Sequence, residues 1–496
     1  MENYTKFAIR GAAIVFIISI IAAFMGYIVR ILLARNLSIE DFGLFYAVIS
    51  FLGLIGVFKS LGFDRALTKF IPEFESKGRN DLIKSSIIYV LAIQAVINSI
   101  VIIAVYLLSN YLSSHFFHNA DAGFALKLMA IAFFIDSFTQ VLKFAFQGFR
   151  RMWYFSLVDL VRMLLIIGII LIGLKTGFGL KIPVYAYILT PLILTIIFGF
   201  IFVKKVFPKF FESKFSWSRR LFRRISKYSI FVLANDVGGV ILGNTDVTML
   251  TYFTDLKNVA LYSVAYPTAR VLLYFPRATG QVLFPLTSEL WAKKRKDLLK
   301  AGIESLYKYS IITIIPIVFV VFSFADLIIS ILYGKEYLLA GNAMKILVLG
   351  IMFAVIHQVN GNFFAGIGKP QITSKIVYVA AAFNFAANLA MIPLLGILGA
   401  AITTAAGYFI MMAMGLFEIR KFIAISYPIK PWAGTFAAGI IAASAIWLLK
   451  KMMAINVWLE TGVILAISGL LYIAVLFLLR VVKVQELKDL YKRVLK

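Results

Sequence analysis

Residues 73–84 read EFESKGRNDLIK, and residues 289–300 read ELWAKKRKDLLK. We refer to these two copies as the first and second charged segments. Six of their positions agree at one constant offset, the one that relates Glu73 to Glu289, and five of the six are charged. Glu73, Lys77, Arg79, Asp81, Leu82 and Lys84 recur as Glu289, Lys293, Arg295, Asp297, Leu298 and Lys300. Because apolar composition does not produce shared charged positions, the agreement indicates an internal duplication.

The composition of the chain predicts a membrane protein. Of its 496 residues, 62% are hydrophobic, whereas about half of the residues of a soluble domain are apolar. Only helices and closed barrels satisfy their backbone hydrogen bonds within a bilayer. The apolar runs are about 20 residues long and do not alternate with polar residues, which is typical of spanning helices. We therefore predict an all-α polytopic membrane protein.

Hydropathy along the chain predicts fourteen transmembrane helices. They are expected at about 8–34, 42–70, 85–109, 123–147, 155–174, 182–203, 228–253, 259–288, 303–330, 341–366, 372–393, 398–419, 431–449 and 458–480. Six spans separate the two charged segments, so both segments lie on the same side of the membrane. We predict two parallel six-helix repeats around a central cavity, followed by two extra C-terminal helices.

This layout predicts four parts of the chain. Residues 1–203 form an N-lobe with spans 1–6, and residues 204–227 form a basic cytoplasmic linker. Residues 228–420 form a C-lobe with spans 7–12. Residues 421–496 contain spans 13 and 14 and a basic tail.

The positive charge of the chain predicts its orientation. The net charge is +27, but its distribution argues against nucleic acid as a partner. Of the lysines and arginines outside the spans, 32 fall on the side of the two termini and 7 on the other side. The positive-inside rule then places both termini in the cytoplasm, in a multi-pass protein of the plasma (inner) membrane. The basic loops also favour contact with anionic membrane lipids.

Several kinds of chemistry are excluded or disfavoured. The chain has no cysteine, which excludes disulfides, thiol catalysis and cysteine-ligated metals. His115 and His118 form an H-x-x-H pair in a predicted external loop, but no third metal ligand accompanies them. No Ser/His/Asp set, phosphate-binding loop or pair of acids on a large loop stands out. We therefore predict neither an enzyme nor a metal site, and assign no catalytic residue.

Span 8 is predicted to present a cationic face. Tyr266, Arg270, Tyr274, Arg277 and Gln281 follow one another at spacings of four, four, three and four residues, so they share one side of a helix. Arginine is suited to bidentate contact with phosphate. Prolines in this span are expected to kink it. The alternative is that its arginines pair with acidic residues of span 7 and only hold the helices together.

The acidic residues of spans 2 and 7 allow two interpretations. Asp236 and Asp246 of span 7 form a site for a coupling Na⁺ or H⁺, or they are the counter-charges of span 8. Asp64 and Arg65 in span 2 are adjacent, so they face different directions and need separate partners.

Other charged pairs inside the spans have the spacing of contacts within one helix. We expect structural pairing of Asp136 with Lys143 and of Asp159 with Arg162. Asn384 and Asn388 in span 11 are expected to hydrogen-bond to a neighbouring helix.

Two segments carry a resemblance to a known family. Ala34–Pro72 reads ARNLSIEDFGLFYAVISFLGLIGVFKSLGFDRALTKFIP, and Asp246–Ala265 reads DVTMLTYFTDLKNVALYSVA. The first is similar to an AR-x-L-x-x-x-D-[FY]-G turn followed by LG-x-D/S-x-AL-x-[KR]-[FY]-[IL]-P, and the second to D-x-x-[ML]-L…[VA]-[AG]-x-Y-S-x-A. At this spacing the chain resembles the polysaccharide-type (Wzx-like) flippases of the multidrug/oligosaccharidyl-lipid/polysaccharide (MOP) exporter superfamily.

The resemblance implies a V-shaped pair of helix bundles that encloses a cationic cavity. It implies passage of a polyprenyl-linked, usually diphosphate-linked, oligosaccharide from the cytoplasmic to the outer leaflet by alternating access. By likeness to lipid II flippases, which also have fourteen spans, Arg30 is expected to face the cavity, and spans 13 and 14 are expected to offer a groove for the lipid tail. We expect the protein to act as a monomer without a cofactor.

The expected binding residues follow from both lines of reasoning. Arg30, Arg65, Arg270, Arg277, Tyr266, Tyr274 and Gln281 are expected to bind the substrate, and Asp64, Asp236 and Asp246 to couple transport to Na⁺ or H⁺. The rival functions are a lipid II-type flippase, a cation-coupled multidrug antiporter of the same superfamily, and a membrane glycosyltransferase or polymerase. The antiporter would need acidic and aromatic walls, and the enzyme would need acids on an outer loop.

Overall fold

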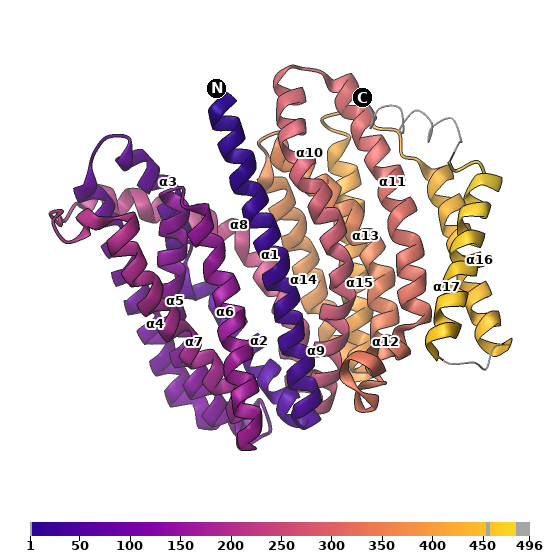
Figure 1. Cartoon of the computed structure of the whole chain (residues 1–496), viewed down its shortest axis with the longest axis horizontal. Helices are drawn as coiled ribbons and strands as arrows, with labels where there is room; N and C mark the ends of the chain where they lie inside the picture. The colour runs from indigo at the N-terminus through magenta and orange to yellow at the C-terminus, as the bar shows by residue number, and fades with distance from the viewer. Residues whose placement is uncertain (1, 453–456, 483–496) are drawn as a thin grey trace. The chain divides into compact units, whose positions relative to one another are not determined.

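The structure is a computed structural model. It describes the backbone of residues 2–452 and 457–482, and the side chains of these ranges except those of residues 2–14, Asn235, Phe275, 277–279, Gln281, Val282 and Val457. Within the described ranges the regular elements are helices, as Figure 1 shows. The prediction of an all-α polytopic membrane protein is therefore confirmed.

The helices group into two compact units, Met1–Ser263 and Val264–Lys496. The first unit contains α1 (Glu2–Asn36), α2 (Ile39–Ser60), α3 (Phe63–Glu75), α4 (Asn80–His115), α5 (Ala122–Gly148), α6 (Met152–Gly173), α7 (Lys181–Ile201), α8 (Arg219–Phe253) and the start of α9 (Leu256–Arg270). The second unit contains the end of α9, α10 (Tyr274–Ala292), α11 (Lys296–Ser323), α12 (Ala325–Tyr333), α13 (Ala340–Gly366), α14 (Pro370–Leu395), α15 (Ile397–Ile419), α16 (Ile429–Met452) and α17 (Val457–Leu478).

The number of spans is lower than the fourteen expected. Among the described residues, 12 helices are long and apolar enough to cross a membrane, and 13 if the two parts of α8, which is bent by 45° after Ala234, count as one span. The expected span at 259–288 is divided into α9 and α10 by a short 3-10 helix, Val271–Leu273. Proline has no backbone N–H and disrupts a helix interior, which accounts for a break flanked by Pro267 and Pro276.

The expected span at 42–70 is also broken. It forms α2 and α3, which are separated at Leu61 and Gly62, both in the left-handed region with φ of 45° and 77°. A Cβ atom added to Gly62 would lie 2.5 Å from the Ser229 carbonyl oxygen of α8. Only glycine therefore combines this backbone conformation with such a close approach to α8.

The two charged segments adopt the same turn. Gly78 and Lys294, which correspond at the offset of the two segments, both have left-handed backbones with φ of 64° and 55°. Matching hydrogen bonds of 2.9–3.1 Å close the two turns, from the amides of Gly78 and Arg79 to the carbonyls of Glu75 and Phe74, and from those of Lys294 and Arg295 to those of Trp291 and Leu290. The duplication is thus visible in local conformation.

A second pair of elements agrees in the same way. Helices α5 and α13 are both 27 residues long and begin with the similar sequences AGFALK and AGNAMK. Each ends in a turn with a left-handed residue, Arg150 in one and Gly368 in the other, with φ of 60° and 75°. These similarities support a duplication, while the full parallel layout of six plus six spans stays a prediction.

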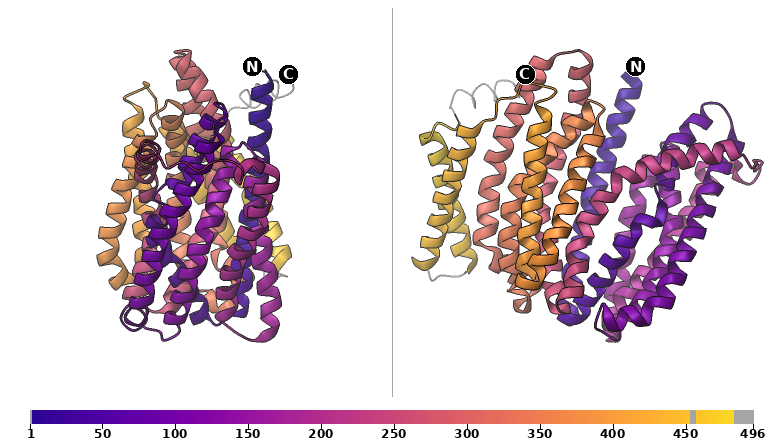
Figure 2. Two further views of the ribbon diagram at one scale, coloured as in Figure 1. Left: turned by 90° about the vertical axis from the view of Figure 1, so that its left-hand side faces the viewer. Right: turned by 180° about the vertical axis from the view of Figure 1, so that it is seen from behind.

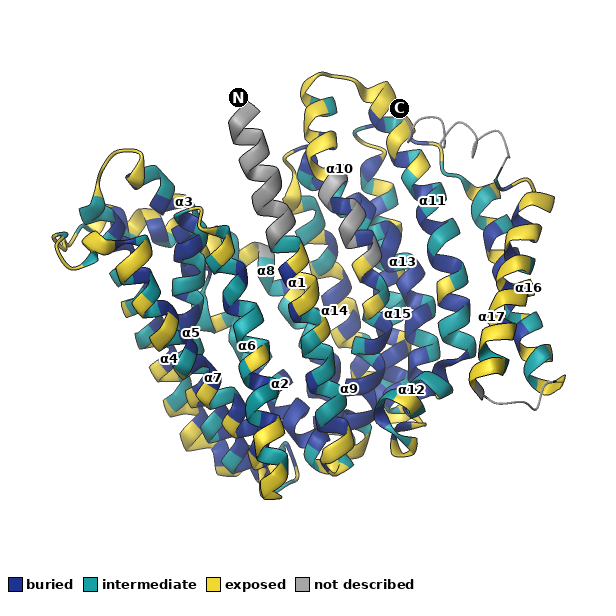
Figure 3. Ribbon diagram, viewed as in Figure 1, coloured by how far each residue is buried: buried dark blue, intermediate teal, exposed yellow. Residues whose placement is uncertain are grey.

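Packing within each unit positions the elements. In the first unit, α5 packs against α4 and α7, and its Phe146 is fully buried among Phe198 and Phe202. In the second unit, α13 lies between α11 and α15 and is the most buried of the candidate spans, as Figure 3 shows by its dark blue colour. Helices α16 and α17 pack on each other, and α16 on α11, so they lie beside this core (Figure 2).

The basic linker predicted at 204–227 is docked on the first unit. It contains parts of a π-helical turn (Phe202–Val206), a 3-10 helix (Pro208–Phe210) and the first two turns of α8. Lys84 donates to the Ser213 carbonyl at 2.8 Å, and Tyr89 to the Ser216 carbonyl at 3.0 Å. Because α8 packs on α2 and α3, it belongs to the first compact unit. The lobe boundaries at 203 and 228 stay predictions.

Candidate functional site

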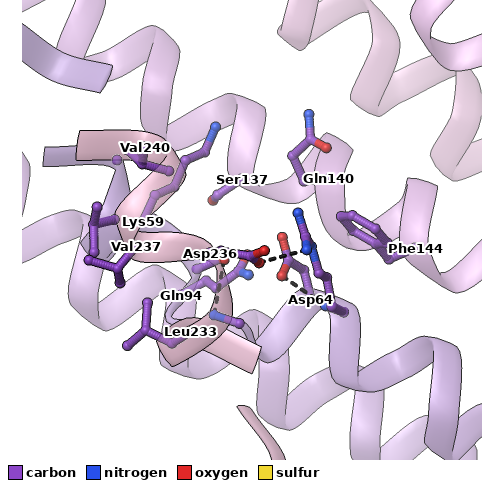
Figure 4. A pocket seen from close by; sticks show the side chains of 15 residues that line it. Lys59, Asp64, Gln94, Ser137, Gln140, Phe144, Leu233, Asp236, Val237 and Val240 are labelled. Atoms are coloured by element: carbon purple, nitrogen blue, oxygen red, sulfur yellow. Dashed lines mark hydrogen bonds and ion pairs between the residues drawn. The ribbon is translucent and has the colours of Figure 1, made fainter. Parts of the chain in front are cut away.

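The first unit contains a polar pocket of about 260 Å³, which lies among α2, α3, α4, α5 and α8. Among the described residues, four charged ones line it, namely Lys59, Asp64, Arg65 and Asp236. Gln94, Ser137 and Gln140 add neutral polar groups, and Phe144 adds an aromatic ring. Figure 4 labels all of these side chains except Arg65 and shows them around the pocket. All of them belong to segments expected to span the membrane, where polar groups are costly and therefore mark candidate sites.

The break between α2 and α3 brings the charged groups together. Lys59 is the second last residue of α2, and Asp64 and Arg65 lie in the first turn of α3. The Arg65 guanidinium forms an ion pair with Asp236 of α8 at 2.6 Å. Asp64 is 7% exposed and accepts the backbone N–H of Arg65 at 2.8 Å. The Arg65 side chain thus has its partner on α8, while a separate partner for the Asp64 carboxylate stays a prediction.

A network of ion pairs borders the pocket. The Asp136 carboxylate contacts Lys59 Nζ at 2.5 Å and Arg162 Nη1 at 2.6 Å, and so joins α5 to α2 and α6. Lys143 of α5 pairs with Asp159 of α6 at 2.6 Å.

The predicted pairs within single helices, Asp136 with Lys143 and Asp159 with Arg162, are therefore wrong. Spacing along a helix shows which residues share a face, but not which neighbouring helix meets that face. Asp136 receives two cations from two neighbouring helices, and such charge-assisted contacts are stronger than one contact along the helix surface.

Arg30 lies at a different place, outside the set of residues that line the pocket. Its guanidinium is 4.1 Å from the centre of the Tyr46 ring, and it donates to the Ser263 carbonyl. Asp246 is 4% exposed and accepts a hydrogen bond from the Tyr262 hydroxyl at 2.5 Å. Arg30 corresponds to Asp246, and Tyr46 to Tyr262, at the same offset that relates the two charged segments. The duplication thus places a cation beside one tyrosine and an anion beside the equivalent tyrosine.

The face expected on span 8 is only partly described. Arg270 lies 5.1 Å from the centre of the Tyr266 ring, and the Tyr266 hydroxyl is 3.4 Å from that of Tyr408. Tyr274 is 40% exposed. The 3-10 helix at 271–273 interrupts the face, so the five residues do not lie on one regular α-helix.

Two further expectations concern the side chains of span 8 and their pairing with the acids of span 7. The side chains of Arg277 and Gln281 lie outside the described residues. The alternative that the span 8 arginines pair with the acids of span 7 stays a prediction, and Asp236 has Arg65 as one partner.

Sequence reasoning missed the neutral polar lining of the pocket. Gln94 is 1% exposed, and neither its amide oxygen nor its amide nitrogen has a hydrogen-bond partner among the described residues. Leaving a buried polar group unsatisfied costs about 1–3 kcal/mol, so such a group marks a place of interest. The available signal was Gln94 with Asn98, one turn later, within an otherwise apolar run.

Asn384 and Asn388 behave as expected. The Asn384 amide donates to the Thr404 hydroxyl of α15 at 3.4 Å, and Thr403 donates to the Asn388 side-chain oxygen. Both link α14 to α15.

Within the described part of the chain, no group of three histidines or acids has the geometry of a metal site. His115 is stacked on Tyr111 and its ring nitrogen is 2.7 Å from the Ser114 hydroxyl.

Comparison with protein families gives two matches. The model described as polysaccharide biosynthesis protein matches residues 8–291, and the model described as MatE matches residues 238–390. The chain is 35% identical to an uncharacterized membrane protein of Methanocaldococcus jannaschii over 100% of both chains. It is 21% identical to the probable low-salt glycan biosynthesis flippase Agl15 of Haloferax volcanii over 98% of this chain and 99% of that protein.

Solved structures share the fold. The lipid II flippase MurJ in an inward closed conformation matches with a TM-score of 0.75 at 14% identity, and covers 97% of this chain and 99% of that chain. An inward-facing multidrug resistance MATE family transporter matches with a TM-score of 0.65 at 15% identity, over 87% of this chain and 96% of that chain. The helical architecture is therefore of the MurJ and MATE type.

Proposed function

The chain belongs to the polysaccharide biosynthesis protein family of the MOP exporter superfamily, and we propose that it moves a polyprenyl-linked oligosaccharide across the membrane. The lipid carries the glycan on a phosphate or diphosphate and passes from the cytoplasmic to the outer leaflet. The product serves the synthesis of surface polysaccharide or glycoprotein. The probable glycan flippase Agl15, which is similar over nearly its whole length, supports this proposal.

The observation that carries the proposal is the charged pocket of the first unit. A sugar with its phosphates does not cross hydrocarbon unaided, because its polar groups would lose their hydrogen bonds. The pocket provides charged and polar groups inside segments that are expected to span the membrane. The Arg65 side chain is 51% exposed, so it is accessible to a headgroup.

Further residues complete the proposed site. Arg30, Arg270 and Arg277 are proposed to contact the phosphates, with Tyr266, Tyr274 and Gln281 beside them. Asp64, Asp236 and Asp246 are proposed to couple transport to Na⁺ or H⁺. We propose that the protein works by alternating access, as a monomer with both termini in the cytoplasm. We also propose that it has fourteen spans, because α9 and α10 together count as one span in addition to the 13 found by length and composition.

The second candidate is a cation-coupled multidrug antiporter. The MatE match over residues 238–390 and the fold similarity to MATE transporters favour it. An organic cation would need an excess of acidic or aromatic groups. The described lining of the pocket has two cations for two carboxylates, which argues against this substrate class.

Native mass spectrometry of the purified protein separates the two candidates. We expect a polyprenyl-linked glycan to copurify, and cationic dyes not to bind. In vesicles with reconstituted protein and a fluorescent diphosphate-linked glycolipid, Arg65→Gln is expected to slow flipping about tenfold to hundredfold, since a hydrogen bond to a charged group is worth about 1.5–3 kcal/mol. Arg79→Gln, in the exposed turn of the first charged segment, is the matched control. Binding of dyes without glycolipid would refute the proposal.

A further inference from the structure

Among the described side chains, the charges that line the pocket of the first unit balance one another. Lys59 and Arg65 oppose Asp64 and Asp236. The Arg65 guanidinium already contacts Asp236 at 2.6 Å, and the Lys59 ammonium already contacts Asp136 at 2.5 Å. A phosphate would have to displace one of these carboxylates and would then lie beside it. The local charge therefore disfavours an anion and favours a neutral polar ligand.

The neutral groups of the pocket are those that recognise hydroxyls. Gln94 has a free amide donor and a free amide acceptor, both buried, with no partner among the described residues. The Ser137 hydroxyl donates to the Phe134 carbonyl at 2.6 Å and keeps its acceptor capacity. Among the described residues, the Gln140 amide makes long contacts of 3.3 and 3.5 Å with Asp136. Donors and acceptors of this kind match the hydroxyl or acetamido groups of a sugar.

Phe144 provides an apolar surface on the same pocket. Its ring suits the C–H face of a pyranose, because binding sites combine an apolar wall with a few placed polar groups. The volume of about 260 Å³ is just below the usual range of about 300–1,000 Å³ for small-molecule sites. This space suits one sugar ring rather than a whole oligosaccharide.

We propose that this pocket binds one neutral sugar residue of the glycan, while the phosphates are held elsewhere. The proposal rests on the function proposed above and specifies the part of the substrate that the pocket recognises. Gln94, Ser137 and Gln140 bind the hydroxyl or acetamido groups, and Phe144 packs against the ring. The Arg65–Asp236 pair stays formed and offers both a donor and an acceptor to the sugar.

The test uses free sugars with the full-length protein in nanodiscs. Saturation-transfer difference NMR is measured with the neutral methyl glycosides of glucose, galactose, mannose, N-acetylglucosamine and N-acetylgalactosamine. Binding of inorganic pyrophosphate is measured in parallel by ³¹P line broadening. Leu233→Trp fills the pocket from α8, where Leu233 lines it. Ile230→Trp is the matched control, because Ile230 lies on the same helix, is 63% exposed and is not among the lining residues.

We expect at least one glycoside to bind, with loss of at least tenfold in affinity for Leu233→Trp and no change for Ile230→Trp. Pyrophosphate binding is expected to be equal in the two variants. The proposal is overturned if no glycoside binds, if glycoside binding is indifferent to Leu233→Trp, or if Leu233→Trp abolishes pyrophosphate binding instead. The melting temperature of each variant shows whether it folds. If Leu233→Trp does not fold, Leu233→Val takes its place. Leu233→Val enlarges the pocket, so it is expected to change which glycoside binds best.

The vesicle assay distinguishes failure of this inference from failure of the proposed function. If the wild-type protein flips the diphosphate-linked glycolipid and Leu233→Trp flips it equally fast, the pocket is not the sugar site, but the function stands. If the wild-type protein moves no lipid-linked glycan, the function fails even where a glycoside binds.

Discussion

Helices α5 and α6 of the first unit and helices α13 and α14 of the second follow the same backbone plan but differ in their interior. The first helix of each pair has 27 residues, and the turns that follow are closed by equivalent hydrogen bonds of 2.8 Å, from Arg151 to the Phe146 carbonyl and from Lys369 to the Phe364 carbonyl. When the two turns are aligned in this way, the charged residues of one pair of helices correspond to small or apolar residues of the other. Asp136, Lys143, Asp159 and Arg162 correspond to Ala354, Gly361, Val377 and Ala380.

This contrast indicates that the charges of α5 and α6 are not required for the fold. The second unit forms the same helix–turn–helix arrangement without them and links α14 to α15 through neutral amides instead. Buried ion pairs contribute little to stability compared with well-packed apolar groups, because both partners must be desolvated. Their presence beside the polar pocket of the first unit therefore favours a role in shaping that site.

The largest effect is expected when the network of ion pairs loses its central carboxylate. Asp136→Leu leaves Lys59 and Arg162, which are 14% and 17% exposed, without their shared partner. Removing one member of a buried ion pair costs about 3–5 kcal/mol. We expect a clear fall in melting temperature, measured by intrinsic fluorescence in detergent micelles.

The second unit supplies the control for this prediction. If the comparison holds, the simultaneous change of Lys59→Met, Asp136→Leu and Arg162→Leu should restore most of the stability, since it gives the first unit an apolar interior like that of α13 and α14. A triple variant as unstable as Asp136→Leu would show that the first unit needs its charges to fold.

A smaller effect is expected at the second ion pair of α5 and α6. Lys143→Met removes the ion pair of Asp159, but the Asp159 side chain is 33% exposed and remains partly hydrated. The expected loss is about 1–3 kcal/mol. Lys127→Met, at the N-terminal end of the same helix, is the control. A loss equal to that of Asp136→Leu would contradict the ranking by burial.

Much of the fold was predictable from the sequence because it depends on patterns along the chain. Runs of about 20 apolar residues must form helices in a bilayer, and the offset of the charged segments is readable directly. The prolines of span 8 predicted a kink, and the break at 271–273 lies between two of them. The break at Gly62 was not predicted, because it depends on the close approach of Gly62 to the Ser229 carbonyl, which hydropathy does not record.

The site was predictable only in part, for a related reason. Asp64, Arg65 and Asp236 were expected to be functional and do meet at one pocket. Lys59 and Asp136 come from different helices, and their pairing depends on how α2 and α5 pack. Gln94 was missed because one buried amide in a long apolar helix changes no periodicity. Sequence reasoning finds costly residues inside spans, whereas their partners follow from packing between helices.

The turns that the two halves share permit an exchange of residues. In each pair of equivalent turns, the residue with the left-handed backbone is glycine in one copy and a longer residue in the other. Gly78 corresponds to Lys294, and Gly368 corresponds to Arg150. The left-handed region is strained for residues with a Cβ atom. Lys294→Gly and Arg150→Gly are expected to stabilise the protein by about 1 kcal/mol each, and Gly78→Lys to destabilise it by a similar amount. Thermal unfolding measures all three, and a loss of stability in Lys294→Gly would mean that the lysine side chain itself contributes.

The smallest effect is expected at the glutamate that opens each charged segment. Glu73 contacts Lys77 at 3.0 Å and also Arg224 of α8 at 2.7 Å, whereas Glu289 contacts Lys293 at 2.5 Å. Exposed ion pairs contribute little, so Glu73→Gln is expected to cost about 0.5 kcal/mol. Glu289→Gln should cost less, because it removes one exposed contact between residues four positions apart.

The pH dependence of Glu289 provides an independent check of this small difference. The hydrogen bond from the Lys293 ammonium holds the pKa of the Glu289 carboxyl below its usual value. A carboxyl with a lowered folded-state pKa stabilises the protein above its unfolded-state pKa, and this contribution is lost as the pH falls through the lowered value. The melting temperatures of the wild type and Glu289→Gln should therefore differ slightly at neutral pH and converge in acid. A difference that persists in acid would mean that the Glu289 side chain acts through packing, not through its charge.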